Sequence, residues 1–333
     1  MPGNLWSYIR QISGRDQLWL SLLSVLVFLL TLAPLEVQRR VVNDAIEHRN
    51  LLSILLLCAA YVVVVLTQGG LKLWLNLYRA RVGETATRHL RLQARKLSKE
   101  VPRAPAQAEY EGVKVSVVVA EVDPVGGFIG LSVSEPLLHG GILLSVFGYM
   151  LILQPWMALV CLGVFLPQIV FVPLMQGAIN RRTKSRIKIL RKFSVDIVDK
   201  ASNSNSSEPT KPLLDQPSVD EGGEDDRYEE RADRIFHLDM HIFRLKFTMN
   251  FLMNSMQHLA IAAILFVGGW FVVEGRTEVG TVVAFISGLE RVNDPWRDLV
   301  NYFREMTSAQ VKYHLVANAL NGAPPGEAGA PAD

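Results

Sequence analysis

The chain has 333 residues, of which 50% are hydrophobic and 20% are charged, and its mean hydropathy is +0.22. These values are apolar for a soluble protein. The formal net charge of +2 gives no reason to expect a nucleic acid partner. The two cysteines, Cys58 and Cys161, are too few for a disulfide framework or a four-cysteine metal site. The composition therefore excludes a disulfide-rich secreted module and a disordered protein.

The apolar residues are concentrated in long runs. A bilayer core of roughly 30 Å requires roughly 20 residues of helix, and the first run, residues 17–32, contains no charge and can just span it. The weakest run, residues 279–289, is followed closely by Glu290, Arg291 and Asp294. We predict an all-α membrane protein whose transmembrane domain covers residues 16–320. Its six spans are expected at about residues 17–34, 51–77, 126–153, 156–176, 249–273 and 279–300.

A short segment, residues 1–15, precedes the first span. Leu5, Trp6, Ile9 and Ile12 have helical spacing, which favours an interfacial helix over this segment. A cleaved signal peptide also begins with a basic flank and an apolar core. The core here is long, no small-x-small cleavage site follows it, and further spans come after it. We therefore expect a retained anchor.

Basic residues indicate the orientation of the spans. Residues 79–114 contain nine Lys or Arg and residues 181–200 contain eight, whereas the connections at 35–50, 154–155 and 274–278 contain four in total. Both basic segments are therefore expected on the cytoplasmic side, together with both termini. The predicted location is a plasma (inner) membrane.

The polar segments next to the spans are helical in character. Residues 78–101 contain no proline and mostly good helix formers, so the second helix is expected to extend into the cytoplasm. The fourth is expected to continue to about Lys200, the fifth to begin near Arg231, and the sixth to reach about Leu320. These extensions would form stalks.

Two segments have the composition of flexible chain. Residues 202–230 contain three prolines, and from residue 208 onward nine acidic residues stand against two basic ones. Such a segment buries too little apolar surface to order itself, so it is predicted to be an acidic flexible cytoplasmic loop. Residues 321–333 are predicted to be a disordered tail.

No catalytic or cofactor-binding motif is found in the sequence. The phosphate cradle Gly-x-x-x-x-Gly-Lys-Ser/Thr is missing, so no nucleotide hydrolysis is expected from this chain alone. His237 and His241 are four residues apart on a predicted helix, a spacing that can hold a metal ion. The general-base Glu of metalloproteases is replaced by Leu238. A solvated polar face is the preferred reading, and no metal site is predicted.

Ionisable residues at membrane depth give a better indication of function. Glu135 and His139 are four residues apart in the third span, and His258 lies in the fifth. Because an ionisable group facing lipid is costly, these side chains are expected to face a cavity or one another. They are the candidate residues of a substrate pathway; the alternative is a structural hydrogen bond between helices. Lys72 either snorkels or faces the same cavity.

Several blocks of sequence resemble a known family. Residues 268–273 read GGWFVV, residues 275–286 read GRTEVGTVVAFI and residues 294–299 read DPWRDL. This order resembles the fifth and sixth helices of ATP-binding cassette (ABC) exporters, where a glycine-rich external turn precedes a helix with an Ala-Phe pair and a later proline. Residues 33–46 and 81–97 resemble the first helix with its external end and the second intracellular helix.

The resemblance implies the type 1 transmembrane-domain fold of ABC exporters, with coupling helices at the cytoplasmic tips. Glu109, Tyr110, Glu111 and Gly112 stand where the first coupling helix would be, and Leu213-Leu214 could supply the second. The nucleotide-binding domain that the family usually carries after the sixth helix is not found in this sequence. ATP and Mg²⁺ would therefore be bound by a partner subunit.

Two functions follow from these observations. The first is the permease subunit of an ATP-driven exporter, which forms the substrate pathway as a homo- or heterodimer in the lipid bilayer. It would couple to a separate ABC ATPase or to a partner half-transporter. The alternative is a motorless membrane scaffold or regulator that keeps the exporter fold without transport activity.

Overall fold

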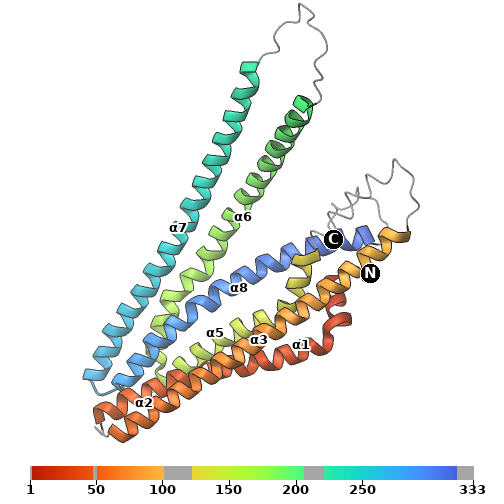
Figure 1. Ribbon diagram of the computed structural model, residues 1–333. Helices are drawn as coiled ribbons and strands as arrows, with labels where there is room; N and C mark the ends of the chain where they lie inside the picture. Colours follow the sequence, from red (N-terminus) through yellow and green to blue (C-terminus); the bar gives the residue numbers. More distant parts are fainter. Residues whose placement is uncertain (1, 48–50, 101–121, 206–220, 321–333) are drawn as a thin grey trace, which may run out of the picture. The chain divides into compact units, whose positions relative to one another are not determined.

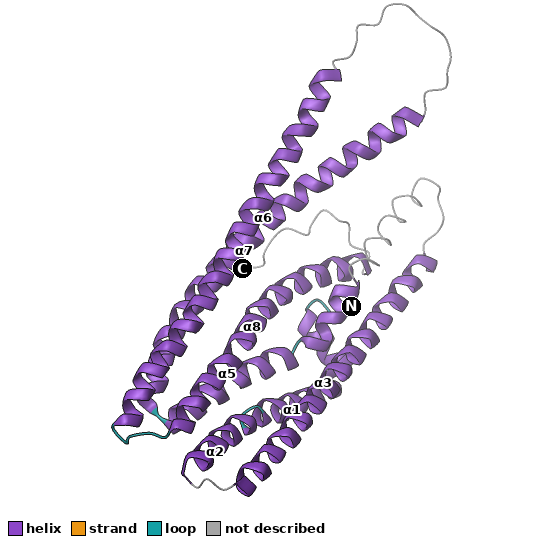
Figure 2. Cartoon of the chain, turned by 60° about the vertical axis from the view of Figure 1, so that its left-hand side comes forward, coloured by secondary structure: helices purple, strands orange, loops and turns teal. Residues whose placement is uncertain are grey.

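A computed structural model describes residues 2–47, 51–100, 122–205 and 221–320, and every regular element in these ranges is a helix (Figure 1, Figure 2). The predicted all-α class is confirmed for this part of the chain. The helices are α1 (Leu5–Leu30), α2 (Ala33–Glu47), α3 (Leu51–Glu100), α5 (Ser134–Leu153), α6 (Pro155–Asn205), α7 (Glu221–Val273) and α8 (Val279–Leu320). A shorter apolar helix, Val122–Leu131, precedes α5.

Five helical stretches are long and apolar enough to cross a membrane: Leu5–Ile46, Leu51–Gln93, Ser134–Leu153, Pro155–Thr183 and Ala232–Val273. The predicted sixth span, residues 279–300, is not among them. It lies in α8, where Glu290, Arg291 and Asp294 lower the hydropathy of the stretch.

Four helices are much longer than a bilayer requires. Helix α3 has 50 residues, α6 has 51, α7 has 53 and α8 has 42. At about 1.5 Å per residue, a helix of this kind is roughly 60–80 Å long, at least twice the thickness of the hydrocarbon core. The predicted helical extension of the second span is therefore confirmed up to Glu100, and that of the sixth up to Leu320.

The two sharp connections follow from local chemistry. Gln154 is extended between α5 and α6, because the following Pro155 disfavours a helical conformation at this position. Helix α7 ends in a Schellman motif, in which Arg276 N–H donates to Phe271 O and Gly275 N–H donates to Val272 O. Gly275 has φ +70°, a conformation that glycine adopts without a steric penalty.

The predicted third span, residues 126–153, is interrupted. Pro136 lies in the first turn of α5, where it has no N–H to donate to the carbonyl of Ser132, and its ring would clash with that carbonyl in a continuous helix. The chain therefore forms a turn at Ser132 and Val133. The Tyr302 hydroxyl of α8 donates to Ser132 O at 2.6 Å instead.

The predicted bounds of the acidic loop, residues 202–230, are wrong at both ends. Helix α6 continues to Asn205 and α7 begins at Glu221, so both ends of the 202–230 segment are helical. Six of the nine acidic residues that argued for a loop fall at positions 221–230, within α7. Residues 206–220 and the predicted tail lie outside the described residues.

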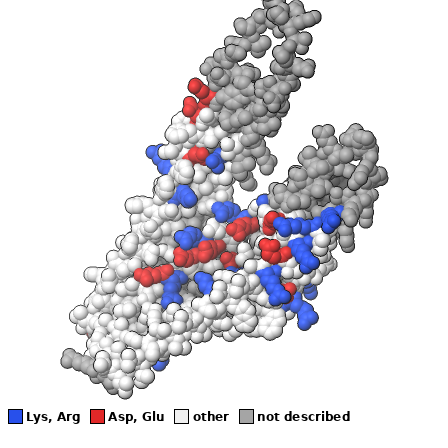
Figure 3. All heavy atoms as spheres, viewed as in Figure 1, with Lys and Arg blue, Asp and Glu red and all other residues white. Residues whose placement is uncertain are grey.

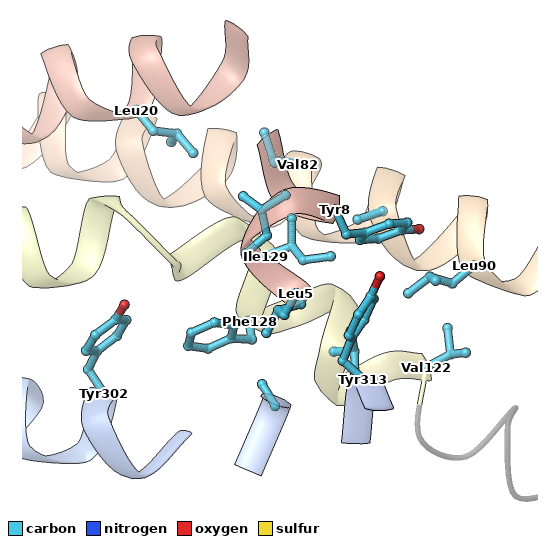
Figure 4. Close-up of a cluster of buried hydrophobic side chains, with 14 of the residues drawn as sticks. Leu5, Tyr8, Leu20, Val82, Leu90, Val122, Phe128, Ile129, Tyr302 and Tyr313 are labelled. Atoms are coloured by element: carbon cyan, nitrogen blue, oxygen red, sulfur yellow. The ribbon is translucent and has the colours of Figure 1, made fainter. Parts of the chain in front are cut away.

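The chain divides into two compact units. The first contains residues 1–161 and 261–333, and its hydrophobic core joins α1, α3, Val122–Leu131 and α8 (Figure 4). Leu5, which we placed in an interfacial helix, exposes only 1% of its surface. Tyr313 packs against Tyr8 at 5.3 Å between ring centroids, and its hydroxyl donates to Pro2 O at 2.7 Å. Burial raises the pKa of Tyr313 above its usual value of 10.

The second unit contains residues 162–260, from α6 and α7. An ion pair of 2.6 Å between Arg186 and Asp239 connects the two helices. Large apolar side chains on both helices are exposed, among them Leu174, Phe247 and Phe251. Exposed surface of this kind is suited to lipid.

Candidate functional site

Small residues bring α3 against the helix Val122–Leu131. Gly126 and Gly130 are spaced as in the Gly-x-x-x-Gly motif of packed membrane helices. A Cβ atom on Gly126 would lie 1.9 Å from Thr87 Oγ1, and one on Gly130 would lie 2.3 Å from the carbonyl oxygen of Arg79. Only glycine allows the two backbones to approach this closely. The contact places Arg79 beside the turn that precedes α5.

Arg79 forms an ion pair with Glu135, the second residue of α5. The distance from Arg79 Nη1 to Glu135 Oε2 is 2.6 Å, and only 7% of the arginine side chain is exposed. A buried charge is costly unless it is paired, so this contact strongly favours the observed position of α5 beside α3. Lys72, also on α3, adds positive potential at Glu135.

His139 lies one turn further along α5, between two carboxylates. Its Nε2 atom is 3.5 Å from Glu135 Oε1 and 3.8 Å from Asp298 Oδ2 on α8. Arg79, Glu135, His139 and Asp298 thus form one charge cluster that links three helices. Asp298 is its most exposed member, with 41% of the side chain accessible.

Four polar atoms of the charge cluster are buried and have no hydrogen-bond partner among the described residues. They are Nε and Nη2 of Arg79, Nδ1 of His139, and Oε2 of Glu135, which forms the ion pair with Arg79 Nη1. The buried amide of Gln17, on α1, donates from Nε2 to Ile129 O at 2.8 Å, next to the same turn. The polar interior around the turn therefore includes groups from α1, α3, α5 and α8.

A second polar group joins α2, α5 and α8. Glu36 accepts hydrogen bonds from Arg39 at 2.9 Å and from the Tyr149 hydroxyl at 2.7 Å. Arg39 also contacts Glu278 at 3.3 Å. Asn43 donates to Glu278, and its Oδ1 atom accepts the N–H of Gly280, in the first turn of α8, at 2.8 Å. We call these residues the α2 network.

The structure brings Glu135 and His139 together, as their spacing predicted. His258 is exposed on α7, in the second unit. The predicted coupling residues, Glu109–Gly112 and Leu213-Leu214, lie outside the described residues. His241 Nδ1 is 2.8 Å from the carbonyl oxygen of His237. Within the described ranges no three His, Cys, Asp or Glu residues are grouped as metal ligands.

Sequence reasoning did not identify two members of the charge cluster. Arg79 belongs to the basic run that we used only for orientation, and Asp298 follows an apolar stretch that already looked weak. The available signal was the position of Arg79 just after the expected second span, residues 51–77. A charge at the end of such a stretch either snorkels to the membrane interface or pairs with a group on a neighbouring helix.

Helix α8 has a polar face that differs from the other exposed faces of its unit. Glu290, Asp294 and Arg297 are exposed at helical spacing, and Arg297 pairs with Asp294 at 2.8 Å. In Figure 3, charged side chains form a band where α8 runs in the same view. In residues 17–30 of α1 and 51–66 of α3 the exposed residues are apolar instead, for example Leu22 and Leu66. One face of the unit is therefore suited to lipid and another to water or to polar groups.

Comparison with known proteins adds no further assignment. No protein-family model matches the chain, and no curated protein matches its sequence. The class of the protein therefore rests on its helices, five of which are long and apolar enough to cross a membrane. The chain is an integral membrane protein.

Proposed function

We propose that this chain is the membrane subunit of a transporter, specifically the permease part of an ABC-type exporter that works with a separate ATPase. The observation that carries the proposal is the polar face of α8. Over residues 290–298 this face presents five charged side chains within a helix whose neighbours expose apolar surface. Charged groups in a lipid-facing position are costly, whereas the wall of an aqueous pathway accommodates them.

The lengths of the helices support the second part of the proposal. Helices α3, α6, α7 and α8 exceed the bilayer thickness. Helices α3 and Val122–Leu131 flank one connection, and α6 and α7 flank another. Such extended helices offer a cytoplasmic ATPase two places to dock. This arrangement agrees with the exporter resemblance of residues 268–299 and with the coupling segments expected at 109–112 and 213–214.

In this proposal ATP binding and hydrolysis take place on the partner, and the long helices transmit the movement. The pathway opens alternately to the two sides of the membrane as the helices of the subunits separate and close. Glu135 and His139 contribute to the wall near Asp298, at the end of the polar face of α8. Two membrane subunits, identical or related, would enclose the pathway.

The test is a pull-down of the tagged full-length chain from detergent-solubilised membranes, followed by mass spectrometry and an ATPase assay. Recovery of an ABC ATPase with measurable ATP turnover is expected. Tyr110→Ala combined with Gly112→Pro should abolish recovery of that partner, because both changes fall in the expected first coupling helix. Val273→Ala, exposed at the opposite end of α7 from these connections, serves as the control and should leave recovery unchanged.

The alternative, a scaffold with the exporter fold and no motor, predicts a different result. The chain would insert normally in the membrane, but neither an ABC ATPase nor ATP turnover would be recovered. That outcome would reject the transport proposal. A protein that retains ATPase recovery in the Tyr110/Gly112 variant would reject only the coupling assignment.

A further inference from the structure

The Arg79 guanidinium uses only part of its hydrogen-bonding capacity. Its Nη1 atom contacts Glu135, whereas Nε and Nη2 have no hydrogen-bond partner among the described residues although only 7% of the side chain is exposed. Nε and Nη2 form one edge of the planar guanidinium, the edge that can bind a carboxylate through two parallel hydrogen bonds. Buried donors without acceptors are unfavourable, so a conformation that pairs this edge would be stabilised.

Asp298 is the carboxylate best placed to pair with it. Glu135 already contacts both Arg79 and His139, at 2.6 and 3.5 Å. Asp298 is joined to the charge cluster through His139, at 3.8 Å, and is the most exposed of the four residues. If Asp298 exchanged its contact with His139 for a bidentate pair with Arg79, it would give up a weak interaction and form a stronger, charge-assisted one.

Helix α8 contains a feature that allows Asp298 to move. Pro295, three residues earlier, lies inside the helix and has no N–H for the carbonyl one turn before it. Helices bend at such positions. Tyr302, four residues after Asp298, is held to Ser132 O by its hydroxyl. The turn between Pro295 and Tyr302 can thus shift towards α3 while the rest of the helix keeps its contacts.

We propose that Asp298 is a second, state-dependent partner of Arg79, and that the charge cluster is a switch between two arrangements of α8. In the arrangement described here Asp298 contacts His139. In the other, the α8 turn moves towards α3 and Asp298 pairs with the Nε/Nη2 edge of Arg79. The assignment of the two arrangements to states of transport rests on the proposed function, but the exchange itself does not.

The experiment uses pulsed electron paramagnetic resonance on the full-length chain in lipid nanodiscs. The native cysteines are first removed by Cys58→Ser and Cys161→Ala. Spin labels are then attached through Arg81→Cys on α3 and Arg297→Cys in the α8 turn between Pro295 and Tyr302, two positions that are exposed. The proposal predicts two distance components, the shorter belonging to the Arg79–Asp298 arrangement. Asp298→Asn should eliminate the shorter component.

Glu135→Gln should have the opposite effect. Without the Glu135 charge, Arg79 loses its buried counter-ion, so Asp298 should be drawn to it and the shorter component should grow. Arg79→Lys keeps a positive charge for Glu135 but has no planar edge, and it should eliminate the shorter component as Asp298→Asn does. Asp294→Asn, one turn before Asp298 on α8, should leave both components unchanged.

If the charge cluster has only a structural role, the variants should change the distances between the spin labels in a different way. Glu135→Gln and Asp298→Asn would then shift the distances in the same direction, or neither would shift them, and either result overturns the switch. Because the labels report on the purified chain, the outcome is independent of the pull-down. Opposite shifts without a recovered ATPase would keep the switch and reject the transport proposal. Recovery of an ATPase without such shifts would support the transport proposal and reject the switch.

Discussion

Gly130 and Arg79 approach so closely that a Cβ atom on Gly130 would lie 2.3 Å from the Arg79 carbonyl oxygen. This backbone contact fixes the helix Val122–Leu131 against α3. It also sets the start of α5 beside the Arg79 side chain, because Glu135 follows shortly after Gly130 in the sequence. The position of the charge cluster thus depends on a glycine that carries no chemistry of its own.

Gly130→Ala should therefore be destabilising, by about 1–3 kcal/mol, since the new methyl group meets backbone and cannot be relieved by a rotamer change. The neighbouring Gly127 is the matched control, because a Cβ atom there would meet nothing within 4 Å. Thermal unfolding in detergent, followed by size-exclusion chromatography, measures the difference. Equal melting temperatures for the two alanine variants would refute the close-packing argument.

Removal of one partner of the Arg79–Glu135 pair should cost more than removal of both. Glu135→Leu leaves a buried guanidinium without its counter-ion, for which about 3–5 kcal/mol is typical, whereas Arg79→Met with Glu135→Leu removes both charges of the pair. The same unfolding assay should place the double variant closer to the parent protein. If the double variant is the less stable one, the two residues do not act as a buried ion pair.

Asn43→Ala should loosen the start of α8. It removes the acceptor of the Gly280 N–H and one donor to Glu278, and an unpaired group of this kind costs about 1–3 kcal/mol. Asp44→Ala, the adjacent position on α2, is the control. Hydrogen exchange of the segment 279–285 should accelerate in Asn43→Ala only, and exchange that stays slow would contradict a capping role.

Two tyrosine hydroxyls on α8 should differ in their importance. Tyr302→Phe leaves the Ser132 carbonyl without its 2.6 Å donor inside the protein, whereas Tyr313→Phe affects Pro2, close to the chain end. We expect a loss of about 1–2 kcal/mol for Tyr302→Phe and a smaller loss for Tyr313→Phe. The reverse order of stability would show that the turn at Ser132 does not depend on Tyr302.

Much of the helical architecture could be predicted from the sequence. The apolar runs located the five helical stretches that are long and apolar enough to cross a membrane, and Gln154-Pro155 marked the sharp connection between α5 and α6. The helical extension after residue 77 was also predicted, because the segment contains good helix formers and no proline. The interruption before α5 was not predicted, although Pro136 was visible. Proline is tolerated in a first turn, so its presence alone does not tell whether a helix begins or continues there.

The charge cluster could be predicted only in part from the local pattern of the sequence. The spacing of Glu135 and His139 placed them on one face of a helix, because residues four apart share a face. Arg79 and Asp298 lie on other helices, far from Glu135 in the sequence and on opposite sides of it, and no local periodicity connects such positions. The packing of the helices alone determines which charged residues pair. Gly126 and Gly130 allow the helix Val122–Leu131 to approach α3 closely, and α8 places Asp298 beside His139.

Hydropathy and helix propensity are properties of short segments, so the order of the residues is enough to specify a helical chain that is apolar enough for a membrane. The partners of the buried charges follow from contacts between distant helices. These partners are therefore determined only by the tertiary structure of the whole unit.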